Sequence, residues 1–227
     1  MRKIVILLVG TIIWACADLR AAVAADAAVY VATYVEIMPH AKTSGATLLK
    51  TEAAATRQED GCSDVEVLGE IGRDERFFVF EIWRDRSAYE AHRITAHARQ
   101  FRDLLAPIEI APPDVRELAG LAGQPAATPG GHAIWVFTHV DVTPTYKDET
   151  ASMLEALADA SGKEAGNLNF IVARQAERPN HFTVSETWAD RASFEAHEEG
   201  VGTRQFREKL APMLGALYDQ RVYQAVE

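Results

Sequence analysis

The feature that most constrains this chain is an internal repeat at a constant offset of 105 residues. The segment Glu81–His92 (EIWRDRSAYEAH) returns as Glu186–His197 (ETWADRASFEAH). Arg99–Arg102 (RQFR) returns at the same offset as Arg204–Arg207, and no gap is needed between positions 29 and 107. A register this long predicts two copies of one unit of about 100 residues, a common domain size.

The repeat divides the chain into four parts. Residues 1–25 are interpreted as a signal peptide, 27–118 as the first repeat and 132–227 as the second. Between the repeats, residues 119–131 (AGLAGQPAATPGG) are small, rich in Gly and Pro, and aperiodic. Such a composition is typical of a flexible connection, so this segment is interpreted as the linker.

The apolar pattern within one unit predicts strands and helices in a definite order. Strands are expected at 29–37, 62–70, 77–83 and 115–118, with helices after Pro39 and after Asp85, the second stopping at Pro107. In the second copy the last strand is expected at 217–226, and Asp190 is the N-cap equivalent to Asp85. The order β-α-β-β-α-β is that of a ferredoxin-like α+β unit.

Both faces of the first predicted strand are apolar or aromatic. One face carries Val31, Thr33 and Val35, and the other carries Tyr30, Ala32 and Tyr34. The helices of one unit can cover only one face of its sheet, so something apolar must cover the other. We expect the sister repeat to do so, giving an intramolecular version of a dimeric α/β-barrel and a monomeric protein with an internal pseudo-dimer.

The N-terminal segment has the composition of an export signal. A basic start at Met1–Lys3 precedes an apolar core at Ile4–Ala15, too short for the roughly 20 residues of a membrane span, and the Ala-rich stretch after it predicts cleavage after Ala24 or Ala25. We therefore expect a periplasmic or secreted protein with no stable membrane insertion after cleavage. The alternatives are an uncleaved anchor or lipidation at Cys16.

The net charge and the cysteine count exclude several classes of binding partner and site. The formal charge of −10 disfavours binding to nucleic-acid phosphates. The chain has 2 cysteines, which excludes a disulfide scaffold or a Cys-rich metal site, and after cleavage Cys62 is alone. Cys62 is then either a buried thiol or a reactive one.

One set of residues resembles a known family. In the first repeat, Glu59-Asp60-Gly61-Cys62 precedes the second predicted strand and Glu81-x-Trp83 ends the third. Asp85 then opens a helix, and His92-x-x-Thr95-x-His97 is followed by Phe101. This pattern resembles the antibiotic biosynthesis monooxygenase family, including its quinol monooxygenase-like members, and the resemblance covers nearly all of the chain beyond the signal peptide and linker, once per repeat. The resemblance implies small ferredoxin-like domains that pair into a barrel.

The resemblance also implies a chemistry. Several members oxygenate electron-rich aromatics, such as quinols and anthrones, with no cofactor. The implied partners are thus a small aromatic substrate, quinol-like or phenolic, and O₂. A histidine is the natural base because its pKa lies near neutrality.

The candidate site residues follow from the motif. His92 would be the catalytic base and His97 its helper, and the substrate-binding candidates are Tyr34, Trp83, Tyr89, His139, Trp188 and His197. Each histidine has a structural alternative, hydrogen-bonded at a helix end, and Glu81 and Glu186 are interpreted as solvated or paired carboxylates. Because Gly202 replaces His97 in the second repeat, we expect the first repeat to be the active one.

The same residues argue against some other functions and leave two alternatives open. Heme-degrading relatives use an Asn and a Trp where this chain has Thr33 and His92, or Thr138 and His197, which argues against heme degradation. His92 and His97 are five apart, whereas a helical metal pair needs four, so no metal is expected. A non-catalytic binding module for small hydrophobic molecules, and an isomerase of small carbonyl compounds, stay open as alternatives.

Overall fold

The computed structural model describes residues 27–123 and 132–226. The predicted signal peptide, Cys16 and most of the predicted linker lie outside these residues. The first repeat consists of β1 (Val29–Glu36), the 3₁₀ helix η1 (Pro39–Ala41), α2 (Lys42–Thr56), β2 (Cys62–Glu70), β3 (Arg76–Trp83), α3 (Arg86–Arg93), α4 (Ala96–Leu105) and β4 (Asp114–Ala122). The second consists of β5 (Ile134–Asp141), η2 (Pro144–Tyr146), α5 (Lys147–Ser161), β6 (Asn167–Gln175), β7 (His181–Trp188), α6 (Arg191–Glu199), α7 (Val201–Leu210), η3 (Ala211–Met213) and β8 (Asp219–Ala225).

The predicted ferredoxin-like order is confirmed in both repeats, with one refinement. The second helical region is broken into two helices, α3 and α4 in the first repeat and α6 and α7 in the second. Asp85 caps α3 by accepting from the backbone N–H of Ala88, as predicted. The break follows from a second cap, because the Thr95 hydroxyl accepts from the Ala98 N–H and so starts a new helix.

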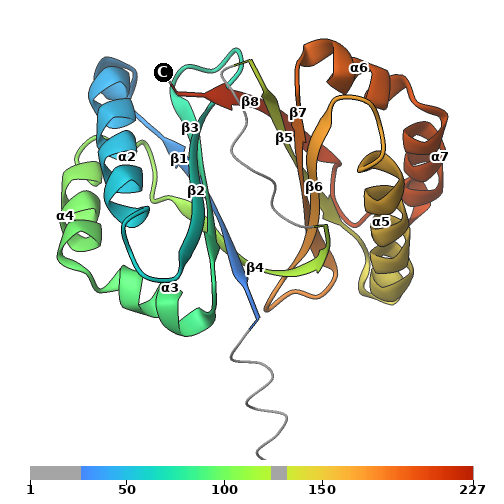
Figure 1. Cartoon of the computed structure of the whole chain (residues 1–227), viewed down its shortest axis with the longest axis horizontal. Coiled ribbons are helices and arrows are strands. Elements are labelled where there is room, and N and C mark those ends of the chain that lie inside the picture. The colour runs from blue at the N-terminus through green and yellow to red at the C-terminus, as the bar shows by residue number, and fades with distance from the viewer. Residues whose placement is uncertain (1–26, 124–131, 227) are drawn as a thin grey trace, which may run out of the picture.

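The eight strands form one closed barrel in the order β1-β3-β2-β8-β5-β7-β6-β4 (Figure 1). The last strand of each repeat crosses to the sheet of the other. β4 pairs with β1 of its own repeat and with β6, and β8 pairs with β5 of its own repeat and with β2. The two sheets are thus closed by exchanged strands, which pair with Leu68–Glu70 of β2 and with 172–175 of β6.

The interior of the barrel is filled mainly by aromatic and aliphatic side chains from both sheets. The buried cluster comprises Tyr30, Ala32, Leu68, Phe78, Phe80, Ile82, Leu118, Ala133, Trp135, Phe137, Ile171, Ala173 and Tyr223. Burying one large side chain of this kind contributes about 1.5–3 kcal/mol. The expectation that the sister repeat covers the second apolar face of each sheet is therefore confirmed.

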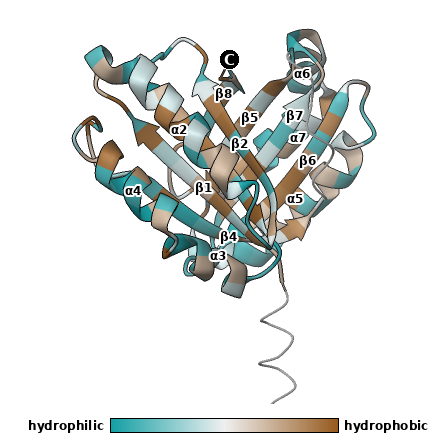
Figure 2. Ribbon diagram, turned by 60° about the vertical axis from the view of Figure 1, so that its left-hand side comes forward, coloured by the Kyte–Doolittle hydropathy of each residue, from teal (hydrophilic) through white to brown (hydrophobic). Residues whose placement is uncertain are grey.

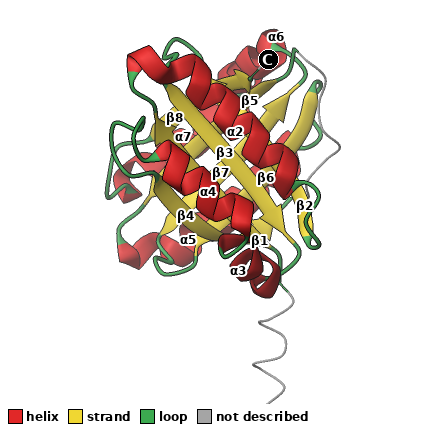
Figure 3. Cartoon of the chain, turned by 90° about the vertical axis from the view of Figure 1, so that its left-hand side faces the viewer, coloured by secondary structure: helices red, strands yellow, loops and turns green. Residues whose placement is uncertain are grey.

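The helices cover the outside of the barrel (Figure 3). Figure 2 shows apolar colour along the strands and mostly polar colour on the outward helix surfaces. On its outer face, β1 presents Val31 and Val35, and α2 packs Leu49 and Ala53 against the same sheet. None of the helices within residues 27–123 and 132–226 is long and apolar enough to cross a membrane.

The predicted linker starts too early. The stretch 119–122 belongs to β4, where Ala119 pairs with Arg174 and Gly120 with Ala173. Its small residues serve close packing, because a Cβ at Gly120 would lie 2.9 Å from the ring of Tyr30. A composition that predicts flexibility here reflects instead a strand that passes closely over an aromatic ring.

Candidate functional site

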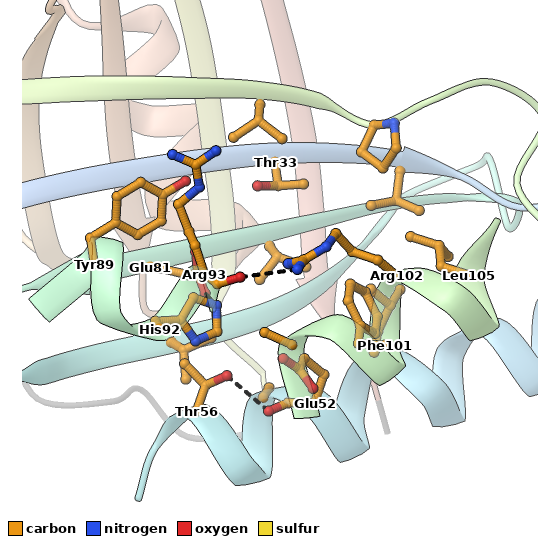
Figure 4. A pocket seen from close by; sticks show the side chains of 18 of the residues that line it. Thr33, Glu52, Thr56, Glu81, Tyr89, His92, Arg93, Phe101, Arg102 and Leu105 are labelled. Carbon is orange, nitrogen blue, oxygen red and sulfur yellow. Dashed lines mark hydrogen bonds and ion pairs between the residues drawn. The ribbon is translucent and has the colours of Figure 1, made fainter. Parts of the chain in front are cut away.

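The first repeat holds a cavity of about 840 Å³ between its sheet and its helices (Figure 4). Its walls come from β1, β2, β3 and β4 on one side and from α2, α3 and α4 on the other. Apolar side chains, among them Leu49, Val79 and Phe101, form much of the surface. The volume suits one small organic molecule.

His92 lies in the wall of this cavity, in the last turn of α3. Its side chain is buried, with 8% of the residue exposed. The ring Nδ1 lies 2.7 Å from Glu59 Oε1, and the ring packs against Trp83 with centroids 4.8 Å apart. The carboxylate and the indole together fix the imidazole, as a base held for one direction of proton transfer requires.

Glu81 is another titratable group in the wall, and it lies beside His92. Its side chain extends from β3 and lies 3.8 Å from His92 Nε2. Burial raises the pKa of Glu81 to about 7, and the nearby His92 partly opposes that rise. Of the two interpretations of Glu81, the structure agrees with the paired carboxylate and not with the solvated one, because Glu81 is buried beside the candidate base.

His97 lies next to this pair rather than in the cavity wall. Its Nδ1 is 2.9 Å from Glu52 Oε1 and its Nε2 is 2.9 Å from Glu59 Oε1. Glu59 therefore contacts both histidine rings, whose centroids lie 5.7 Å apart. The structure thus brings the two predicted histidines together through Glu59, a residue of the motif to which the sequence assigns no role in the site.

The other predicted residues fall into two places. Tyr89 lines the same cavity, and Trp83 lies fully buried behind His92. Tyr34 and His139 lie instead in the barrel interior, where the Tyr34 hydroxyl is hydrogen-bonded to His139 Nε2. Their position on the inner face of β1 and β5 separates them from the His92 cavity, so they form no part of its wall.

The Tyr34–His139 pair has its own electrostatic environment. Burial, together with the charge of Arg116, lowers the pKa of His139 to about 3. Burial also raises the pKa of Tyr34 well above its ordinary value. Thr183 Oγ1 lies 3.1 Å from His139 Nδ1. Both partners are therefore neutral near pH 7, which suits a hydrogen bond inside an apolar barrel.

The second repeat preserves part of the arrangement. His197 Nδ1 lies 3.0 Å from Glu164 and its Nε2 lies 3.6 Å from Glu186. Trp188 donates its indole N–H to Glu186 at 2.9 Å. Burial raises the pKa of Glu186 to about 8. His197 is almost fully buried, with 2% of the residue exposed.

The corresponding part of the second repeat differs in several side chains. Phe170 stands where the first repeat has Val65, and its ring lies 6.0 Å from that of His197. Thr138 is fully buried, whereas its equivalent Thr33 is partly exposed and lines the cavity. Leu157 and Gly202 replace Glu52 and His97. The two repeats therefore share a scaffold and differ at the site.

Sequence reasoning missed the carboxylates that hold the histidines. A usable signal existed, because Glu59 and His92 are 33 residues apart and so are Glu164 and His197. The spacing argument against a metal also fails, since it assumes that His92 and His97 share one helix. The helix break after Arg93 removes that assumption.

Cys62 is partly buried, and burial raises the pKa of its thiol to about 11, which favours the unreactive form.

Solved structures show the same fold. A candidate monooxygenase of Fusobacterium nucleatum superposes with a TM-score of 0.80 at 16% identity, over 88% of this chain and 93% of that one. A candidate monooxygenase of Lactobacillus acidophilus gives 0.73 at 14% identity, over 87% and 93%. An anthrone oxidase-like protein gives 0.68 at 15% identity, over 89% and 92%.

Sequence comparison adds a relative and a family. An uncharacterized protein of Synechocystis sp. is 33% identical over 91 residues, which is 38% of this chain. The chain spans 62% of the length of that relative. The family model for antibiotic biosynthesis monooxygenase matches twice, at residues 28–104 and 133–209. The chain therefore belongs to the antibiotic biosynthesis monooxygenase family and carries its domain twice.

Proposed function

We propose that the first repeat is a cofactor-independent monooxygenase for a small phenolic or quinol-like aromatic compound. The observation that carries this proposal is the position of His92. It is a buried imidazole in the wall of a cavity, held at Nδ1 by Glu59. A base fixed beside a largely apolar cavity meets the main requirement of this chemistry, which is removal of a proton from the bound substrate.

The proposed reaction begins with removal of a proton. His92 accepts the proton of a substrate hydroxyl, and the resulting phenolate is electron-rich enough to pass an electron to O₂. Recombination of the two radicals forms a C–O bond and gives a hydroperoxide on the ring carbon. Its O–O bond then breaks, so that one oxygen atom stays on the carbon and the other leaves as water with two hydrogens of the substrate. A quinol and O₂ thus give a hydroxyquinone and water. The apolar walls around Phe101 and Val79 would exclude bulk water from the reactive anion.

The alternative is a non-catalytic carrier of small hydrophobic molecules. One observation favours it, because His197 has the same Glu and Trp partners in the second repeat, where the equivalents of Glu52 and His97 are missing. The histidine–carboxylate contact could then belong to the scaffold alone. The alternative predicts ligand binding without oxygen uptake.

Oxygen consumption with a panel of hydroquinones and phenols separates the two. The assay uses the purified full chain in the presence of a chelator. We expect uptake of one O₂ for each hydroxyquinone formed. Binding of panel compounds, seen by fluorescence, with no oxygen uptake would assign the protein to the carrier alternative.

The proposed function also includes export of the chain and a monomeric state. We infer that the chain is translocated, cleaved after Ala24 or Ala25, and active as a monomer in the periplasm or outside the cell. The basic and apolar start of the sequence supports export. Intact-mass measurement of the secreted protein, and its sedimentation, test the two statements. Retention of Met1, or a lipid on Cys16, would contradict the first, and an obligate dimer the second.

A further inference from the structure

Five titratable side chains of the first repeat meet at one edge of the cavity. This histidine–glutamate cluster comprises Glu52 of α2, Glu59 of the following turn, Glu81 of β3, His92 of α3 and His97 of α4. Figure 4 shows His92 and Glu52 in the same part of the wall. The proposed function uses only part of the cluster, namely His92 and its partner Glu59.

Every ring nitrogen of the cluster faces a carboxylate. His97 contacts Glu52 and Glu59, both at 2.9 Å, and His92 contacts Glu59 at 2.7 Å and Glu81 at 3.8 Å. A neutral imidazole carries one N–H, so two neutral rings supply protons for only two of these four contacts. In the others a nitrogen lone pair faces an oxygen lone pair, unless a further proton on the ring or on the carboxyl group lies between them. A bound cation that accepts the lone pairs is the other way to satisfy these contacts.

The geometry suits such a cation. One ligand atom each from Glu52, His92 and His97 lie within 4.8 Å of one another. Metal bonds of about 2.0–2.2 Å place tetrahedral ligand atoms about 3.4 Å apart, so small side-chain rotations suffice. Glu59 then remains beside both rings as an outer carboxylate, an arrangement that orients histidine ligands in metal sites.

The second repeat provides an internal comparison. It retains Glu164, Glu186 and His197, which correspond to Glu59, Glu81 and His92. The two positions that complete the cluster are lost together, because Leu157 and Gly202 stand in place of Glu52 and His97. The fold therefore forms without the Glu52–His97 pair. A scaffold role accounts for the retained residues and leaves the additional pair unexplained.

We propose that Glu52, His92 and His97 bind one divalent transition-metal ion. Two imidazoles and one carboxylate suit Zn²⁺, Fe²⁺ or Co²⁺ better than Mg²⁺ or Ca²⁺, which prefer all-oxygen sites. Glu52 and His92 line the cavity, so the remaining coordination positions face it. This site goes beyond the proposed function, which takes no metal. With Glu59 on Nδ1, His92 has only Nε2 free, so it can act as the base in the metal-free chain or as a ligand in the metal-bound chain, but not as both at once.

Metal titration of the purified chain tests the proposal. After treatment with a chelator, Zn²⁺ is added in a calorimeter and Co²⁺ is followed by visible absorption. We expect one ion per chain. Glu52→Gln and His97→Ala should each weaken binding by more than about 100-fold, whereas His197→Ala should leave it unchanged. Circular dichroism melts confirm that each variant is folded. Absence of binding, or binding that Glu52→Gln and His97→Ala leave intact, overturns the proposal.

The second repeat allows a test by gain of function. The double substitution Leu157→Glu with Gly202→His restores both missing ligands beside His197. A Cβ at position 202 meets nothing within 4 Å, so the new side chain has room. We expect two ions per chain. A folded double variant that still binds one ion contradicts the ligand assignment. These measurements use neither substrate nor O₂, so their failure is distinct from failure of the proposed oxygenation.

Discussion

Tyr34 and His139 occupy the same position in the two repeats, and their side chains are hydrogen-bonded to each other inside the barrel. Equivalent residues meet in this way where a pseudo-twofold axis passes between the repeats. Arg116 and Arg221, also equivalent, lie over the Tyr34 ring at 5.2 and 5.1 Å. A homodimer would place two identical residues on this axis. The tandem chain instead holds a phenol against a neutral imidazole.

This pair predicts a pH dependence of stability. The pKa of His139 is lowered to about 3 in the folded chain, so at mildly acidic pH only the unfolded chain binds its proton. Stability should therefore fall as pH drops below about 6.5, the ordinary histidine value. His139→Gln removes this contribution, and its stability relative to the wild type should rise by about 2 kcal/mol between pH 7 and pH 4.5.

Urea unfolding at the two pH values measures this difference. The exposed His40 supplies the matched control, because His40→Gln also removes one histidine but leaves the barrel interior untouched. An identical change in stability of both variants between pH 7 and pH 4.5 would show that the buried imidazole is not responsible.

Turnover should depend on the first repeat. With any active quinol, His92→Ala should lower kcat by about 100-fold or more, the scale expected for loss of a general base. Glu59→Gln keeps the packing and loses only the anionic partner of the ring, so its effect should be smaller. His197→Ala should leave kcat nearly unchanged. Oxygen uptake and melting curves are measured together, and equal losses from His92→Ala and His197→Ala would indicate two working sites.

Glu186 predicts the opposite pH trend to His139. Its pKa is raised to about 8, so between about 4.5 and 8 the folded chain keeps a proton that the unfolded chain has lost. Stability should fall as pH rises through this window, with the full cost above pH 8. Glu186→Gln removes that cost while its amide oxygen can still accept from Trp188.

Denaturation midpoints at pH 5, 7 and 9 test the Glu186 prediction. The variant should gain on the wild type as pH increases. The exposed Glu195, on α6, provides Glu195→Gln as the control. If the difference between Glu186→Gln and wild type is the same at all three pH values, the carboxyl does not titrate as predicted.

Substitution by alanine should lower the stability of the chain to different extents at two glycines. Gly123 and Gly72 have φ values of +80° and +85°, so alanine is strained at both. A Cβ at Gly123 would lie 1.9 Å from the carbonyl oxygen of Phe170, whereas one at Gly72 meets nothing within 4 Å. Gly123→Ala should therefore destabilise the chain by about 1–3 kcal/mol more than Gly72→Ala, as overpacking does. Chemical denaturation of both variants measures the gap.

The fold was predictable because it rests on patterns within the sequence. The repeat predicted the two units, the apolar character of both faces of β1 predicted the barrel, and Asp85 predicted a helix start that the structure confirms. The end of β4 was not predictable from composition. Its small residues are required by the ring of Tyr30, a contact between distant parts of the chain.

The site was predictable only in part, for a similar reason. His92 and His97 belong to a local motif, whereas Glu52 and Glu59 reach them from α2 and the turn that follows. Such contacts between elements leave no local pattern. The sequence predicts Tyr34 and His139 as substrate-binding residues, and only the barrel geometry separates them from the cavity.

The exchange of terminal strands also has a consequence for the order of synthesis. β2 lies in the first repeat, yet the outer edge of its last residues, Leu68–Glu70, pairs with β8, which is synthesised after every other strand of the two repeats. Until residues 219–225 arrive, this part of the edge exposes unpaired N–H and C=O groups to any neighbouring strand. Completion of the first repeat therefore waits for β8, and a chain that stops before it leaves a surface prone to aggregation.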